Sequence, residues 1–156
     1  MDSLIVFVAK YFIVLSLLIF AWFWFRSPRS TKFELALRLI VGGALALAIS
    51  VISSHLYYDP RPFVVDHVRP LFAHPADNGF PSDHALFTSL LGFTVLAYSK
   101  RAGGLLLAVA IGAARMAAHV HSLQDIVGSF VISALAAIVA ARLIRRRHLL
   151  ARLWRH

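Results

Sequence analysis

The chain has 156 residues, of which 60% are hydrophobic and 15% are charged, and it contains no cysteine. The apolar share exceeds the roughly 45–50% of soluble domains, and one small domain cannot cover so much apolar surface in a single core, so the composition excludes a disordered chain and an ordinary soluble enzyme and favours a membrane protein. The absence of cysteine excludes disulfides, thiolate metal sites and cysteine nucleophiles.

Five apolar stretches predict an all-α integral membrane helical bundle with about five transmembrane helices. A bilayer core of about 30 Å requires about 20 helical residues, so the third and fourth stretches are short for a span. Asp2 precedes the first stretch and no small-residue cleavage site follows it, so we expect an uncleaved span. A single membrane-embedded domain over residues 1–156 is expected, with a polar segment at 57–81. The stretches cover residues 4–25, 33–56, 83–98, 103–118 and 122–144.

The basic residues predict the orientation of the bundle. A net charge of +9 is compatible with nucleic-acid binding, but with five spans most lysines and arginines fall on one side, which the positive-inside rule assigns to the cytoplasm. The amino terminus and the 57–81 segment then lie outside, residues 145–156 form a basic cytoplasmic tail, and no nucleic-acid partner is expected. The residues on the cytoplasmic side are Arg26, Arg29, Lys32, Arg38, Lys100, Arg101, Arg142, Arg145, Arg146, Arg147, Arg152 and Arg155.

Most histidines and acidic residues lie between residues 55 and 125, at the predicted outer end of the bundle. Ionisable groups at membrane depth are costly and usually functional, so a polar site is expected there. A solvated loop is the preferred interpretation for four of these residues, which are Asp66, His67, His74 and Asp77.

Two clusters at this end favour phosphate binding. Two prolines hold the chain extended around Arg61 in residues 59–63. Ser82 has the position of an N-cap for the third apolar helix, with Asp83 and His84 in the first turn. A helix amino terminus binds anions such as phosphate through its free N–H groups. An ordinary helix cap with an interfacial histidine is the alternative.

A third cluster consists of Arg115, His121 and Asp125. His121 and Asp125 are four residues apart and share a face if both are helical, so the carboxylate can hold one imidazole nitrogen and leave the other free to react. Arg115 can bind a phosphoryl group with two hydrogen bonds, although a buried Arg–Asp pair joining two helices is the alternative. Together the clusters suit phosphoryl transfer through a covalent histidine, with no metal and no cofactor.

These residues resemble the motifs of the type 2 phosphatidic acid phosphatase (PAP2) superfamily, which are Lys-x6-Arg-Pro, Pro-Ser-Gly-His and Ser-Arg-x5-His-x3-Asp. Arg61-Pro62 matches the end of the first motif, and residues 81–84 match the second. Arg115, His121 and Asp125 match the spacing of the third.

The motif core covers residues 54–125 and departs from the family at three positions. Ser54 stands where the family has lysine, Asp83 where it has glycine and Ala114 where it has serine. The family often has six membrane helices, one more than expected here.

Within the superfamily the chain is most similar to the undecaprenyl-diphosphate phosphatases of the bacitracin-resistance type. This resemblance implies hydrolysis of undecaprenyl diphosphate to the monophosphate and phosphate on the outer face of a bacterial plasma membrane, with the lipid tail entering between helices. Alternatives are a phosphatase for phosphatidylglycerol phosphate, lipid A or phosphatidic acid, and a small membrane transporter. The oligomeric state stays open.

The resemblance also implies roles for individual residues. His121 is the expected nucleophile, Asp125 orients it, and His84 serves as general acid and then base. The expected phosphate-binding groups are Arg61, Ser82, Arg115 and the backbone N–H groups of Asp83 and His84.

Lys10 is a further candidate because it lies within the first apolar stretch. A lysine near mid-membrane costs roughly 2.5–3.5 kcal/mol on insertion scales. One interpretation is snorkelling of its ammonium to the outer head groups. The other is that Lys10 binds substrate and supplies the cation missing at Ser54.

Overall fold

The computed structural model describes residues 1–100 and 102–153, with side chains up to Arg145. The five predicted helices are confirmed, and the described residues add one short helix that the sequence did not predict, α3. The helices are α1 (Asp2–Arg26), α2 (Arg29–Leu56), α3 (Pro62–Val65), α4 (Asp83–Ser99), α5 (Gly103–Ala117) and α6 (Leu123–Leu153). Because α6 continues past residue 144, the predicted basic tail begins as helix, and the side chains of residues 146–156 lie outside the described part.

Within the described residues, three helices are long and apolar enough to cross a membrane, and they are Asp2–Arg26, Arg29–Leu56 and the Leu123–Arg145 part of α6. α5 is a shorter apolar helix, and α4 has 17 residues. The two short helices are those whose apolar stretches were already short in the sequence. Large apolar side chains remain exposed along the three long helices, among them Leu18, Trp22, Ile40, Leu47 and Leu135, as expected for helices that face lipid.

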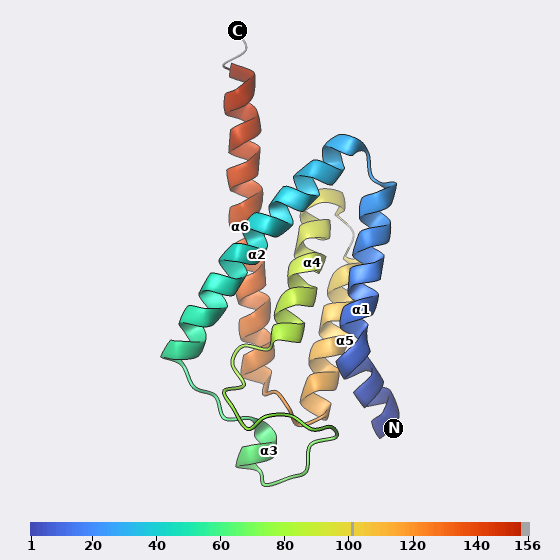
Figure 1. The fold of residues 1–156 in the computed structure, drawn as a ribbon, viewed down its shortest axis with the longest axis vertical. Coiled ribbons are helices and arrows are strands. Elements are labelled where there is room, and N and C mark those ends of the chain that lie inside the picture. The colour runs from blue at the N-terminus through green and yellow to red at the C-terminus, as the bar shows by residue number, and fades with distance from the viewer. Residues whose placement is uncertain (101, 154–156) are drawn as a thin grey trace.

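The five predicted helices run alternately up and down, and α4 packs against the other four, which are α1, α2, α5 and α6 (Figure 1). The core between α2, α4 and α6 contains Leu86, Leu90 and Ile132. α4 and α5 approach closely where Gly92 meets Gly104, since a Cβ atom on Gly104 would lie 3.0 Å from the Gly92 Cα. Only residues without a side chain permit this approach.

Hydroxyl groups join α4 to α6, beginning at the polar end of the bundle and continuing toward its middle. The Ser89 Oγ donates to the Ser133 Oγ at 2.8 Å, and the Ser129 Oγ donates to the Ser82 carbonyl at 3.0 Å. These buried bonds fix the start of α4 relative to α6, because an unpaired polar group there would be costly.

The two ends of the bundle differ in composition. The amino terminus, the 57–82 segment with α3, and the α5–α6 connection lie at one end, whereas the α1–α2 and α4–α5 connections and the end of α6 lie at the other (Figure 1). The basic residues Arg26, Arg29, Lys32 and Lys100 belong to this second end. The expected segregation of basic residues from the histidine-rich end is therefore present in the fold.

Candidate active site

His121 and Asp125 form the centre of the polar end. The His121 Nδ1 lies 3.0 Å from the Asp125 Oδ2, and the two side chains are only 3% and 1% exposed. The sequence analysis expected a shared helix face only if both residues were helical, and this condition is not met because α6 begins at Leu123. His121 lies in the preceding connection, and the contact is made across the start of the helix.

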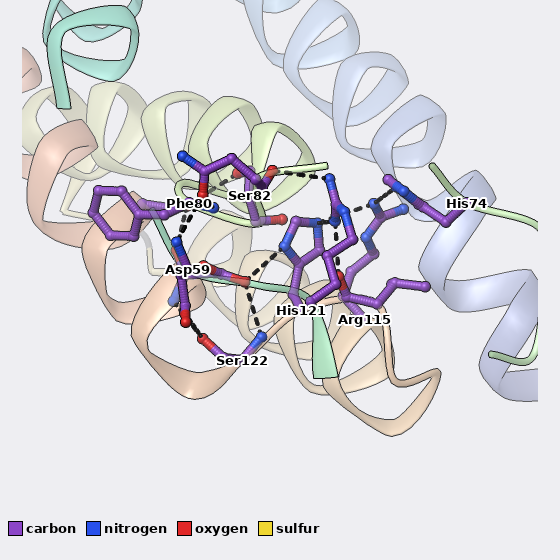
Figure 2. Close-up of polar contacts among 12 residues, drawn as sticks. Asp59, His74, Phe80, Ser82, Arg115, His121 and Ser122 are labelled. Carbon is purple, nitrogen blue, oxygen red and sulfur yellow. Dashed lines mark hydrogen bonds and ion pairs between the residues drawn. The ribbon is translucent and has the colours of Figure 1, made fainter. Parts of the chain in front are cut away.

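A capping box holds this geometry. The Ser122 Oγ accepts the Asp125 N–H at 3.2 Å, while the Asp125 Oδ2 accepts the Ser122 N–H at 2.9 Å. Such reciprocal bonds satisfy free N–H groups in the first turn of a helix. The same carboxylate oxygen faces His121 (Figure 2), so the cap of α6 also orients the imidazole.

Two guanidinium groups face the other nitrogen of His121. The His121 Nε2 lies 3.1 Å from the Arg115 Nη2 and 3.3 Å from the Arg61 Nη1. Because arginine only donates and a carboxylate only accepts, we assign the proton to Nδ1 and a lone pair to Nε2. Arg61 and Arg115 are only 6% and 4% exposed, so the structure brings both predicted arginines onto the predicted nucleophilic nitrogen.

Arg61 is fixed by three further contacts. Its Nε donates to the Asp77 Oδ1 at 2.8 Å, its Nη1 to the Val120 carbonyl at 2.8 Å and its Nη2 to the Asn78 carbonyl at 3.3 Å. Asp77 is solvent-exposed, as the solvated-loop interpretation expected, since its side chain is 61% exposed, but its carboxylate also pairs with Arg61.

Asn78 organises the loop around Arg61, and the sequence reasoning missed it. Its Oδ1 accepts the N–H groups of Asp59 at 2.9 Å and Phe80 at 3.0 Å, and its Nδ2 donates to the carbonyls of Ser54 and Tyr57 at 2.9 Å each. These four bonds add to the single antiparallel bridge between Pro60 and Asn78 and fix a segment that has little regular structure. A single asparagine between two motifs gives no sequence signal for this role.

Asp59 and Gly79 complete the link between the loop and α6. The Asp59 Oδ2 accepts the Ser122 Oγ at 2.6 Å. A Cβ atom on Gly79 would lie 2.7 Å from the Asp125 Oδ2, so the loop passes too close to that carboxylate for any side chain at this position. The glycine was the available signal for this close approach.

The second motif lies at the start of α4, as predicted, but its serine does not cap the helix through its side chain. Ser82 directly precedes α4, yet its side chain makes no capping bond. It is fully buried, and its Oγ has no hydrogen-bond partner within the described residues. Asp83 and His84 occupy the first turn and border the same pocket as the two arginines.

The pocket has a volume of about 460 Å³. Its polar lining includes Arg61, His74, His84, Arg115 and His121, and α2 contributes a further part of the lining. Ser82 and Lys10 are not among its lining residues. The α2 part consists of Leu47, Ser50, Val51 and Ser54.

Lys10 lies at the same end of the bundle, but its ammonium contacts an aromatic ring. Its Nζ is 4.8 Å from the centre of the Phe72 ring, whose face also lies 5.5 Å from the Arg115 Cζ. A cation over an aromatic face is a favourable contact. The structure therefore connects Lys10 to Arg115 through Phe72, and it does not bring the ammonium to His121.

Burial and neighbouring charge determine the protonation of the loop groups. Burial lowers the pKa of His121; the hydrogen bond to Asp125 opposes this shift, and Arg115 and Arg61 add to it. Burial raises the pKa of Asp77, but the hydrogen bond and charge of Arg61 outweigh it and hold that pKa below its ordinary value. At neutral pH the site therefore contains a neutral His121 beside two guanidinium groups, which suits an incoming anion.

The chain resembles known proteins over most of its length. Residues 35–149 match the family model of the PAP2 superfamily. The undecaprenyl-diphosphatase BcrC of Bacillus subtilis (strain 168) is 32% identical over 136 residues, which cover 85% of this chain and 69% of that protein. The bacitracin transport permease protein BcrC of Bacillus licheniformis is 30% identical over 132 residues, which cover 82% of this chain and 63% of that protein. No solved structure matches significantly.

Proposed function

This chain is a membrane protein that belongs to the PAP2 superfamily, and from that premise we propose that it hydrolyses undecaprenyl diphosphate to the monophosphate and phosphate, without a metal ion. One observation carries the proposal. The His121 Nδ1 is held by a buried carboxylate while its Nε2 faces two buried guanidinium groups. This arrangement leaves a lone pair aimed at the place where an anion would be held.

The proposed reaction has two steps. The His121 Nε2 attacks the terminal phosphorus and the bond from phosphorus to the bridging oxygen breaks, while His84, which enters the step as the imidazolium with the anionic substrate bound, gives its second proton to the lipid monophosphate that leaves. His84 then takes a proton from water, the water oxygen attacks the phosphohistidine, and phosphate departs with His121 restored. Asp125 stabilises the charged imidazole in between.

The donors around His121 are proposed to hold the phosphoryl oxygens. Arg61, Arg115 and the N–H groups at the start of α4 supply the positive charge that a metal ion supplies in other phosphatases. Ser82 and Lys10 stay predictions for this role, since neither lines the pocket. Among the described residues no three carboxylate or histidine groups are arranged to hold a metal ion.

The wall formed by α2 supports a lipid substrate. Leu47 and Val51 line the pocket and are 64% and 48% exposed, so the pocket reaches an apolar face of the bundle. We propose that the head group enters past these residues while the polyprenyl tail remains in the hydrocarbon. Another lipid phosphate would fit the same chemistry, whereas a transporter would leave the His121–Asp125 pair without a use.

The segregation of charge supports the proposed orientation. The basic connections lie at the end opposite the site, and the positive-inside rule assigns that end to the cytoplasm. The active site would then face the outer side of a bacterial plasma membrane and the carboxyl terminus the cytoplasm.

Phosphate release by the purified protein tests the proposal. Undecaprenyl diphosphate is compared with phosphatidic acid, phosphatidylglycerol phosphate and lipid A, each with and without EDTA. We expect the highest kcat/KM for undecaprenyl diphosphate and no effect of EDTA. A higher kcat/KM for another lipid would contradict the assignment of undecaprenyl diphosphate as the substrate. Loss of activity in EDTA, with recovery in Mg²⁺, would contradict the metal-free mechanism.

A further inference from the structure

His74 borders the pocket although no motif contains it. It lies in the 57–81 segment and is half-buried, and its Nε2 is 3.1 Å from the Arg115 Nη2. The His74 and His121 rings stand edge to face with their centres 6.1 Å apart. One nitrogen of Arg115 therefore bridges two imidazoles, as Figure 2 shows.

The proton on His74 is assigned by the same reasoning as for His121. Its Nδ1 lies 3.4 Å from the Pro75 carbonyl, which requires a donor, and arginine requires an acceptor at Nε2. Burial lowers the pKa of His74, and the charges of Arg61 and Arg115 lower it further. With a neutral His74, the Arg115 Nη2 can donate one of its two hydrogens to the His74 Nε2 and the other to the His121 Nε2.

Arg115 depends on His74 more than Arg61 depends on any single partner. Arg61 has a carboxylate and two carbonyl groups as partners besides His121. The hydrogen bonds that Arg115 makes within the described residues go to the two imidazoles, and its buried Nε has none. Beyond these, the face of Phe72 supports its guanidinium.

The two imidazole contacts cannot both persist during the proposed reaction. When the His121 Nε2 attacks phosphorus, its lone pair is used for the new bond and no longer accepts from Arg115. His74 is then the remaining acceptor for that nitrogen. Without it, the guanidinium would be free to turn away from the phosphoryl oxygens when they carry the most charge.

We propose that His74 is a positioning residue whose Nε2 keeps the Arg115 guanidinium in the pocket while the His121 Nε2 exchanges that guanidinium for the phosphoryl group. The replacement of Arg115 by the phosphoryl group at the His121 Nε2 rests on the proposed function. The positioning of Arg115 by His74 should favour the binding of any phosphate-like anion, whichever lipid is the substrate.

Two substitutions separate the acceptor from the bulk of the ring. His74→Phe keeps a ring beside Phe72 and removes the acceptor, whereas His74→Gln removes the ring and keeps an amide oxygen that can accept from Arg115. His67→Asn is the control, since His67 is an exposed histidine of the same segment with a φ of 52°, and asparagine tolerates that conformation.

Each full-length variant is measured in detergent for orthovanadate binding by calorimetry and for kcat and KM on undecaprenyl diphosphate. We expect His74→Phe to weaken vanadate binding and to lower kcat about tenfold each, with His74→Gln within about threefold of the parent and His67→Asn unchanged. Equal behaviour of the Phe and Gln variants, whether both active or both impaired, would overturn the role of the acceptor. If the parent binds vanadate with this pattern but releases no phosphate from the lipid, the proposed substrate fails and the role of His74 stands.

Discussion

The helix ends and the 57–81 segment each supply half of the candidate site, and they hold their residues in different ways. His84, Arg115 and Asp125 lie within one turn of a helix end, and the capping box of α6 fixes the neighbouring His121. Arg61 and His74 lie in a segment whose described regular structure is one short helix. The four hydrogen bonds of the Asn78 side chain hold this segment, together with a few backbone bonds such as those from Gly79 to Asp59 and from Phe63 to His119.

The difference shows how robust each half should be. A helix end remains in place as long as the helix does, so a local change there alters chemistry more than position. The loop depends on a few hydrogen bonds, each contributing about 0.5–1.5 kcal/mol net. A substitution in the loop should therefore displace catalytic groups that are not themselves changed. Substitutions in the two halves should differ in how they affect kcat, its pH dependence and the free energy of unfolding.

The largest effect is expected at the nucleophile in the helix-end half. His121→Ala should lower kcat at least about 1,000-fold, or roughly 4 kcal/mol, because the covalent route is lost. Phosphate release and acid-labile labelling of the protein with ³²P-substrate measure this. His119→Asn is the control and should keep full activity, since His119 is exposed; the reverse result would make His119 the nucleophile.

A smaller loss is expected at the carboxylate that orients the nucleophile. Asp125→Asn should lower kcat about 100-fold, roughly 2.7 kcal/mol, because an amide oxygen still caps Ser122 but no longer stabilises a charged imidazole. Asp125 raises the pKa of His121 against the effect of burial, so its removal lowers that pKa further and keeps His121 neutral to more acidic pH. The acid limb of kcat/KM should shift to lower pH, and a shift to higher pH would contradict this electrostatic role.

The loop half is tested at the residue that anchors it. Asn78→Ala removes four hydrogen bonds and should lower kcat about tenfold, because Arg61 loses its fixed position although it is not itself changed. The free energy of unfolding should fall by about 2 kcal/mol, visible as a lower Tm in detergent. Asn78→Asp keeps both accepted bonds and should lie between Ala and the parent, whereas an Asn78→Ala variant with parental kcat would remove the distinction between the halves.

The smallest effect is expected at Lys10, which reaches the site only through Phe72. Lys10→Met should lower kcat/KM about two- to threefold with normal membrane insertion, measured by phosphate release from matched amounts of protein. A loss of tenfold or more, partly rescued by Ser54→Lys, would instead establish Lys10 as the substrate-binding cation that the sequence suggested.

The sequence by itself determined the class of fold and the helix-end half of the site. Continuous apolar stretches without alternation indicate helices in a bilayer, where a helix satisfies every backbone group within its own segment. The second and third motifs are short-range patterns at helix ends, and the alternation of the predicted spans places His84, Arg115, His121 and Asp125 at one end of the bundle.

Only the tertiary structure decided the rest. The contacts of Arg61 join it to Asp77, Asn78 and Val120, and no periodicity links these positions. Asn78, His74 and Gly79 act through pairings between segments far apart in the chain. Such pairings leave no local pattern, because each depends on where two helices place the ends of a loop. The sequence showed which chemistry was present, whereas the packing of α2, α5 and α6 around that loop selected the residues that hold it in place.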